Sequence, residues 1–424
     1  MEYFDRLGSY VRDLWKQKQY DERCFPQVAY AALSEVPPYK NTSFEEVVEY
    51  ALRSESLPTQ ADLQGEFGQP PLTVYSGRDF RIEVLFWTGA TPAIHQHAFS
   101  GAFHVMHGSS LHTTWDCKVE ERVSSHLLYG QINLGQAELL NLGDIRIIHC
   151  GPRFIHATFH LETPTVSIVV RTTNEQDQLP QYAYLPPTIC YNARDNIASI
   201  KRKGQILAML VNAGRAEQHD ECLRQLFASA DPYSLFHYLY QANLVRDKQA
   251  FEELLSAAAV HQGKLVENMR PAASYVRRQG EITKLRGKVT NMDLRFLLAL
   301  LINVPDGEAL LRLVRSRWPD EDPISKFIAG IKQLSDADQL GEKFSDPWLL
   351  VLECLLRGIG GKVEIERAFA LKYGEAQVQN QRTKIQNLAE SVRHFWLFRP
   401  LFDKLTSDNS AGQTVPMIAS RMAG

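Results

Sequence analysis

The 424-residue sequence lacks paired cysteines, long apolar runs and any excess of charge of one sign. Its six cysteines include no CxxC pair, which argues against a disulfide framework and a thiolate metal site, so we expect reduced thiols in a cytoplasmic protein. The longest apolar run, Phe296 to Ile302, is too short to cross a bilayer. The first ten residues lead into no apolar stretch of the kind found in a secretory signal.

The charged residues are nearly balanced, with 46 Lys and Arg against 49 Asp and Glu and a net charge of -3. Such a balance argues against a nucleic-acid surface, and we expect neither a nucleic-acid nor a membrane partner. The sequence also contains no G-x-G-x-x-G fingerprint after a strand, no P-loop and no G-x-S-x-G elbow. These absences argue against the usual dinucleotide, nucleotide and serine-hydrolase classes.

The period of the apolar residues divides the chain into helical and extended parts. Residues 1–60 show apolar positions at three-to-four spacing, and Ser43 with Glu46 forms a predicted capping box. From about Thr73 the period becomes two, and about eight short extended runs follow within 100 residues. Short, closely spaced strands of this kind are typical of a sandwich or a barrel.

Beyond the proline-rich piece Leu185–Thr188 the pattern becomes helical again. Asp322-Pro323 and Asp346-Pro347 predict helix N-caps followed by proline in the first turn. We therefore predict an α+β multidomain chain. Its parts are an N-terminal helical segment (1–60), a β-barrel (61–190), a large all-α domain (191–406) and a flexible tail (407–424).

Nine of the thirteen histidines lie between His95 and His160, a window of 66 residues. Residues two apart on a strand point the same way, so His95 and His97 direct two imidazoles at one point. Two histidines alone do not complete a metal site, so at least one further ligand is needed. A third ligand is available from His149, His156 and His160, and the pattern alone leaves the choice among these three open.

This window resembles the two sequence motifs of the cupin superfamily. The matching residues are Gly89, His95, His97 and Gly108 for the first motif, and Gly143, Asp144 and His156 for the second. Gly101 stands where an ordinary cupin has a ligand Glu, and His160 stands in place of the usual Asn. The resemblance implies a double-stranded β-helix barrel in which His95, His97 and His156 hold a metal.

Two segments resemble the cysteine dioxygenase group more closely, over about residues 75–172. They are RDFRIEVLFWTGATPAIHQHAFSGAFHVMHGSSLHTTWD and IIHCGPRFIHATFHLETPTVSIVV. That group holds ferrous iron with three histidines, so the resemblance implies Fe(2+) as cofactor, with another divalent metal as the alternative. It also implies no Cys-Tyr crosslink, because Gly101 occupies the position from which some relatives supply the cysteine.

The sequence departs from that group where the substrate would lie. Ser167 is kept, but Val169 and Arg171 replace the His and Tyr of the group's Ser-His-Tyr relay. We expect Arg171, and also Arg81, to bind an anionic substrate. His160, which shares a strand face with His156, is expected to have a catalytic role. It would contact either a metal-binding histidine or the substrate.

The expected function is therefore an enzyme, a mononuclear non-haem Fe(II) dioxygenase that activates O2 against a small metal-chelating thiol or amino-acid derivative. The expected partners are that substrate and O2, with a homodimer as a candidate assembly. One alternative is a metal-dependent cupin oxygenase, rearrangement enzyme or isomerase of a biosynthetic pathway, without thiol oxidation. The other is a non-catalytic ligand-binding cupin that signals through its helical domain.

Overall fold

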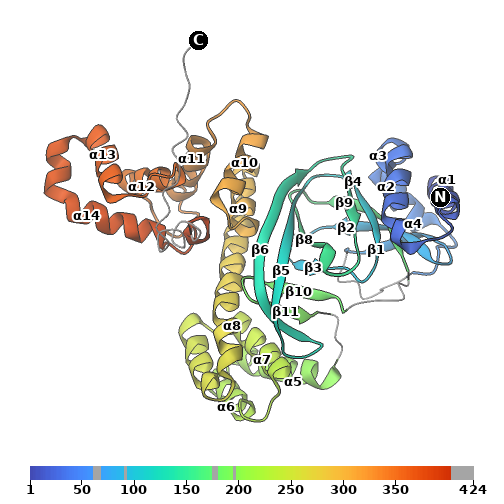
Figure 1. Ribbon diagram of the computed structural model, residues 1–424, viewed down its shortest axis with the longest axis horizontal. Coiled ribbons are helices and arrows are strands. Elements are labelled where there is room, and N and C mark those ends of the chain that lie inside the picture. Colours follow the sequence, from blue (N-terminus) through green and yellow to red (C-terminus); the bar gives the residue numbers. More distant parts are fainter. Residues whose placement is uncertain (61–67, 90–92, 174–179, 194–196, 403–424) are drawn as a thin grey trace. The chain divides into compact units, whose positions relative to one another are not determined.

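The computed structural model describes residues 1–60, 68–89, 93–173, 180–193 and 197–402 (Figure 1). The chain divides into two compact units, Met1–Glu281 and Ile282–Gly424. Every strand of the described residues belongs to the first unit. The domain limits expected from the sequence, at 60/61 and 190/191, stay predictions, and the expected tail 407–424 lies outside the described residues.

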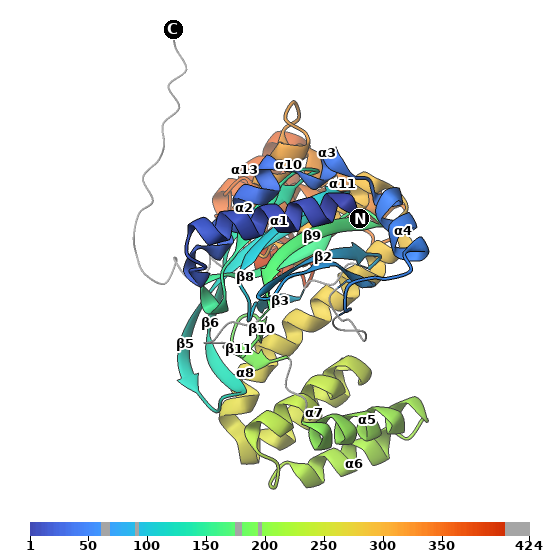
Figure 2. The same cartoon turned by 90° about the vertical axis from the view of Figure 1, so that its right-hand side faces the viewer.

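Four helices precede the strands: α1 (Glu2–Gln17), α2 (Phe25–Glu35), α3 (Pro38–Asn41) and α4 (Phe44–Arg53). The capping box predicted at α4 is present, because the Ser43 hydroxyl accepts from the Glu46 amide and the Glu46 carboxylate accepts from the Ser43 amide. Apolar residues of α1 and α2, among them Leu7 and Phe25, pack against the first β-sheet. Figure 2 shows α1 crossing that sheet.

The first sheet has the strand order β1-β2-β9-β4-β7, and all its pairs are antiparallel. Its strands are β1 (Pro71–Ser76), β2 (Phe80–Trp87), β4 (Gly101–His107), β7 (Ile145–Ile148) and β9 (Thr165–Thr172). One face, with Ile82 and Val84, packs on the N-terminal helices. The opposite face, with Phe103 and Val169, shares a core with Leu140 of the second sheet.

The second sheet closes on itself as a six-stranded barrel, β10-β11-β6-β5-β8-β3. Its strands are β3 (Ile94–Gln96), β5 (Ser110–Arg122), β6 (Leu127–Leu140), β8 (Ile155–His160), β10 (Tyr182–Leu185) and β11 (Ile189–Asn192). The β10-β11 hairpin completes the closure, because β10 pairs with β3 and β11 pairs with β6. The mixed α and β architecture with a β-barrel, predicted from the sequence, is thereby confirmed.

His104 of β4 lies on the helix side of the first sheet, where its ring stacks on Tyr39 at a centroid distance of 5.5 Å. Burial lowers the pKa of His104 to about 4. The unfolded chain therefore takes up a proton near pH 6.5 that the folded chain resists until about pH 4. The stability due to a neutral His104 is complete above pH 6.5, falls as the pH falls from 6.5 to 4, and is absent below about pH 4.

We expect His104→Phe, which keeps a ring against Tyr39, to remove this pH dependence. Between pH 7 and pH 4 the wild type should lose about 3 kcal/mol more unfolding free energy than the variant. Urea denaturation at both pH values measures the difference. His107→Phe, at an exposed position of the same strand, is the control and should follow the wild-type profile. Parallel profiles for wild type and His104→Phe would contradict the prediction.

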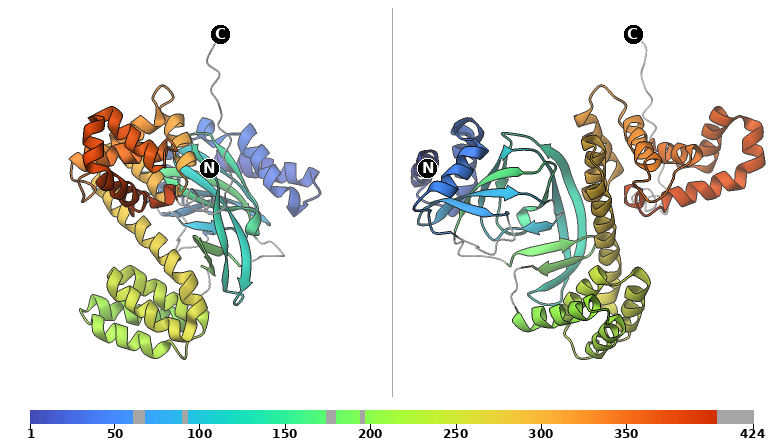
Figure 3. Two further views of the ribbon diagram at one scale, coloured as in Figure 1. Left: turned by 60° about the vertical axis from the view of Figure 1, so that its left-hand side comes forward. Right: turned by 180° about the vertical axis from the view of Figure 1, so that it is seen from behind.

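The first unit continues with helices on the other side of the closed barrel: α5 (Ala198–Asn212), α6 (Ala216–Leu226), α7 (Pro232–Val245) and most of α8 (Lys248–Lys288), which is kinked at Gln262. Their core, which includes Phe236 and Leu239, contacts Tyr129 of β6 and Ile189 of β11. Figure 3 shows these helices from two further sides.

The second unit contains α9 (Met292–Asn303), α10 (Gly307–Arg317), α11 (Pro323–Asp336), α12 (Asp346–Leu356), α13 (Lys362–Tyr373) and α14 (Glu375–Arg393). Asp322 caps α11 as predicted. At α12 the predicted cap was wrong by one residue: the Ser345 hydroxyl accepts from Trp348, and Asp346 is the first helical residue.

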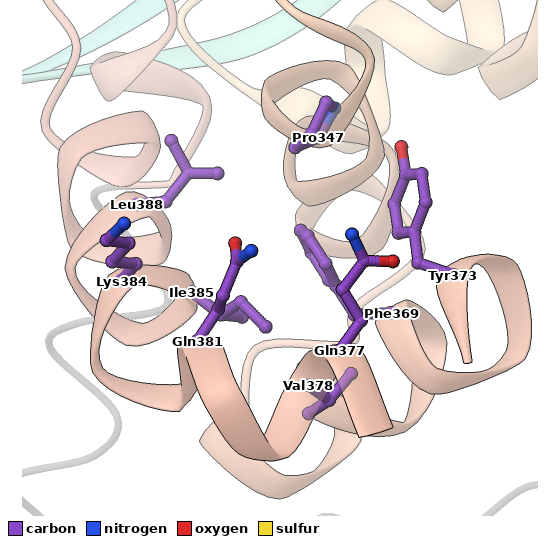
Figure 4. A pocket seen from close by; sticks show the side chains of 9 residues that line it. All are labelled: Pro347, Phe369, Tyr373, Gln377, Val378, Gln381, Lys384, Ile385 and Leu388. Carbon is purple, nitrogen blue, oxygen red and sulfur yellow. The ribbon is translucent and has the colours of Figure 1, made fainter. Parts of the chain in front are cut away.

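A hollow of about 180 Å³ lies among α12, α13 and α14, and Figure 4 shows its nine lining side chains. None of the nine is His, Cys, Asp or Glu, so this hollow is not a metal site. Among the helices in the described residues, none combines the length and apolar character needed to cross a membrane.

Candidate metal centre

Three histidines come together between the two sheets. The ring nitrogens of His95, His97 and His156 lie within 4.8 Å of one another, and the three residues form a group that could hold a metal ion. His97 and His156 are buried, whereas His95 is partly exposed. Of the three residues that the sequence offered as third ligand, His156 is the one that joins the pair from 95 and 97.

Strand pairing brings the group together. His95 of β3 lies directly opposite His156 of β8, and His97 follows at the end of β3. Ile155 and Ala157, the neighbours of His156, pack into the apolar interior of the closed barrel. Since side chains alternate along a strand, His156 faces the other way, toward the first sheet, where its ring lies 6.1 Å from that of Phe103.

Hydrogen bonds determine which nitrogen of His95 can bind a metal. Its Nδ1 lies 3.0 Å from the carbonyl oxygen of Ala93, which can only accept. The proton therefore lies on Nδ1, and Nε2 of His95 is the nitrogen with a lone pair. A ligand histidine that donates its other ring N–H to a carbonyl is the usual arrangement in metal sites.

A longer chain of hydrogen bonds determines the tautomer of His156. The Glu138 carboxylate lies 2.9 Å from Nδ1 of His112, so this nitrogen donates to it. Nε2 of His112 then accepts from Nδ1 of His156 at 3.1 Å. Arg146 completes the chain by donating to both oxygens of Glu138. The result is a His156 whose Nε2 carries a lone pair and points into the group.

The donor set fits a divalent cation. Nε2 of His97 lies 2.8 Å from Nε2 of His156, close to the spacing of about 3 Å expected for two nitrogens bound at right angles to one metal ion. A divalent cation bound by both nitrogens would replace the hydrogen bond that Nε2 of His97 and Nε2 of His156 can otherwise share. Burial, with the nearby His95 and His97, lowers the pKa of His156, so the imidazole is neutral and available as a ligand.

We expect Glu138→Gln to weaken metal binding, because it removes the charge that fixes the tautomers of His112 and His156. Loss of such outer partners costs about 10- to 100-fold in affinity. Anaerobic Fe(II) titration against a chromophoric chelator measures the change. Glu120→Gln, an exposed carboxylate of β5 that accepts from Gln131, is the matched control. Equal affinities for the two variants would contradict the role of Glu138.

The structure places the other predicted histidines near the group but outside it. His160, expected to be catalytic, accepts from or donates to the Ser110 hydroxyl at 3.0 Å, and its ring stacks on Trp87 at 4.5 Å. Burial lowers the pKa of His160 to about 3, so its ring is neutral near pH 7. His149 is partly exposed beyond the end of β7. The catalytic role of His160 stays a prediction.

Both predicted substrate-binding arginines lie on the face of the first sheet that looks toward the metal group. Arg81 and Arg171 are paired across β2 and β9, and Glu83 forms ion pairs with Arg81 at 2.9 Å and with Arg171 at 3.5 Å. The Arg171 guanidinium lies 3.5 Å from the centre of the Phe99 ring, which in turn lies 4.5 Å from the His97 ring. The Arg171 guanidinium is therefore separated from the metal-binding candidate His97 by one aromatic ring.

The structure gives a steric reason for the missing fourth ligand. A Cβ atom at Gly101 would lie 2.9 Å from the Cα of Arg171 and inside van der Waals contact of the Val170 carbonyl oxygen. No side chain fits there without moving β9, so neither a carboxylate ligand nor a crosslinking cysteine can be accommodated. Val169, at the position of the dioxygenase relay histidine, is buried beside Phe103.

Two residues of the centre were not anticipated from the sequence. The sequence pattern predicted no role for His112, which is buried and hydrogen-bonds to His156. Glu138 was not singled out at all. Three adjacent strands contribute to these hydrogen bonds, with His112 opposite Glu138 and Thr114 opposite His156. Only the register of β5 with β6 and β8 therefore predicts that His112 links Glu138 to His156.

No protein-family model matches the sequence, and no curated protein is significantly similar to it. Among solved structures, the chain is similar to the crystal structure of the DMSP lyase DddQ from Ruegeria pomeroyi DSS-3. The likeness covers 40% of this chain and 93% of the lyase chain, with 14% identity and a TM-score of 0.21. Both values are too low to carry the lyase's activity to this chain.

Proposed function

We propose that the chain is a metal-dependent enzyme of the cupin type that acts on a small anionic substrate. The observation that supports this most is the three-histidine group, in which the Ala93 carbonyl sets the tautomer of His95 and the hydrogen bonds through His112 to Glu138 set that of His156. A purely structural histidine cluster needs no such arrangement of lone pairs toward one point. Fe(2+) is the metal we propose, with another divalent ion as the alternative.

The proposed substrate is anionic and binds the metal itself. Three neutral imidazoles leave the full charge of a divalent ion and up to three positions for substrate and O2. Arg171, whose guanidinium lies against the Phe99 ring beside His97, is the proposed contact for a carboxylate or similar group, and Arg81, its partner across β2 and β9, is the second proposed contact. When bound, Fe(2+) would supply oxygen activation, which gives a dioxygenase as the first proposed reaction.

A second candidate is favoured by the residue at position 169. A dioxygenase of the cysteine dioxygenase type uses a His there in its relay, whereas Val169 has no polar atom in its side chain and is buried in an apolar core. A reaction in which the metal acts as a Lewis acid, such as an isomerisation or an elimination, needs no relay at that position.

Oxygen consumption separates the two reactions. Protein loaded anaerobically with Fe(II) should be mixed with panels of thiols, amino acids and other small carboxylates while O2 uptake and product formation are followed. Uptake matched to product supports the dioxygenase, and turnover without uptake supports the Lewis-acid reaction. The variant Arg171→Ala should raise KM for the anionic substrate more than it lowers kcat. No turnover with any member, despite one bound metal per chain, would favour the ligand-binding module instead.

A further inference from the structure

Two cysteines meet inside the closed barrel, on the side of the strands away from the metal group. Sγ of Cys117 on β5 lies 3.3 Å from Sγ of Cys190 on β11. Both belong to the apolar cluster that fills the barrel with Trp115 and Ile155. Their strands pair with β6 from its two sides, so the two side chains come together across that strand.

We propose that Cys117 and Cys190 form a redox-active dithiol that a peroxide converts into a disulfide between β5 and the β10-β11 hairpin. The sulfur atoms need to approach by a little over 1 Å to reach the bond length of about 2.05 Å. This dithiol is distinct from the metal group and independent of the proposed function.

The two thiols differ in a way that assigns their roles. Cys117 is partly exposed, whereas Cys190 is fully buried. The hydrogen bond from Cys190 lowers the pKa of the Cys117 thiol, and the same bond raises the pKa of Cys190. Cys117 is therefore the sulfur that is more accessible to a small oxidant and more easily present as the thiolate.

The oxidation is balanced with hydrogen peroxide as the oxidant. The Cys117 thiolate attacks one peroxide oxygen, the O–O bond breaks, and hydroxide leaves as Cys117 becomes a sulfenic acid. The Cys190 sulfur then attacks the Cys117 sulfur, the S–S bond forms, and the hydroxyl leaves as water. In total, two thiols and one peroxide give one disulfide and two waters.

The disulfide would act on β3, which carries His95 and is followed directly by His97. Cys190 is paired with Tyr184 of β10, and Tyr184 donates to the side chain of Gln96, which lies between His95 and His97. Gln96 also donates to the Pro180 carbonyl at 2.8 Å, and Ala183 is paired with His95. Fixing the hairpin to β5 therefore restricts the motion of β3.

Peptide mapping of the full-length protein tests the proposal. After a short treatment with hydrogen peroxide and blocking of remaining thiols, digestion should give a Cys117–Cys190 linked peptide about 2 Da lighter than its two thiol components. Cys117→Ser and Cys190→Ala should each abolish it, and Cys222→Ser, at a partly exposed position of α6, should leave it unchanged. Absence of this peptide from oxidised wild type, or linkage of Cys117 or Cys190 to other cysteines instead, overturns the proposal.

Thermal unfolding and metal release give two readouts beyond the linked peptide. The oxidised wild type should melt several degrees higher than the reduced form, and the Cys222→Ser control should show the same shift. Release of metal to a chelator should be several-fold slower after oxidation, and an unchanged rate would overturn the coupling to β3. Failure of metal binding altogether would leave the peptide result intact, so the two proposals fail separately.

Discussion

Replacement of His156 by alanine is expected to reduce bound metal from about one ion per chain to less than a tenth of that. Nε2 of His156 lies 2.8 Å from Nε2 of His97, and the other ring nitrogen of His156 is hydrogen-bonded to His112. Two remaining histidines on one short strand bind a divalent ion far more weakly than three. Mass spectrometry of the metal content after anaerobic Fe(II) loading and desalting measures the loss.

The controls for His156→Ala are the two histidines that the sequence left as alternatives. His149→Ala and His160→Ala should keep their metal, because neither residue belongs to the three-histidine group. Retention of metal by His156→Ala together with its loss from either control would assign the third ligand to that residue instead. A circular dichroism spectrum like that of the wild type is required of each variant, so that unfolding is not mistaken for loss of a ligand.

The second large effect is expected at Gly101. The variant Gly101→Ala should lower the unfolding free energy by about 3 kcal/mol, because its Cβ atom meets the backbone of β9 rather than a flexible side chain. Thermal or urea denaturation measures this loss. Gly101→Glu should be destabilised at least as much and should not bind metal more tightly, since the carboxylate cannot be placed as a fourth ligand.

Gly280→Ala is the matched control for this substitution. Gly280 lies in α8, and a Cβ atom at this position would meet no neighbouring part of the protein within 4 Å, so alanine should stabilise the helix by up to about 1 kcal/mol. Opposite signs for the two glycines would show that close approach of β9, not loss of glycine as such, causes the effect at 101. Wild-type stability of Gly101→Ala would contradict the steric explanation.

Local patterns in the sequence were sufficient for the parts of the centre that lie on one strand. The step of two between His95 and His97 predicts a shared direction, because side chains alternate in any strand. The capping box at Ser43 was equally local, and it is present. The third ligand needed the register of β3 with β8, which the resemblance to cupins supplied and the strand pairing now gives directly.

The hydrogen bonds that run from His156 through His112 to Glu138 could not be predicted from local sequence patterns. His112 and Glu138 are separated by 26 residues and meet only through the register of two long strands that contain bulges. A shift of one residue would turn His112 away from His156. In the same way, no local pattern predicts that Cys117 and Cys190 meet, since their contact depends on β5 and β11 both pairing with β6.

Closure of the second sheet also bears on how the protein avoids aggregation. Unpaired strand edges are templates to which a strand of another chain can add. Among the described residues, every strand of the closed barrel has a neighbour on both sides, whereas the first sheet ends in β1 and β7. The β10-β11 hairpin therefore protects the edges of the sheet that carries His95 and His156, and strand addition is confined to the first sheet, which faces them.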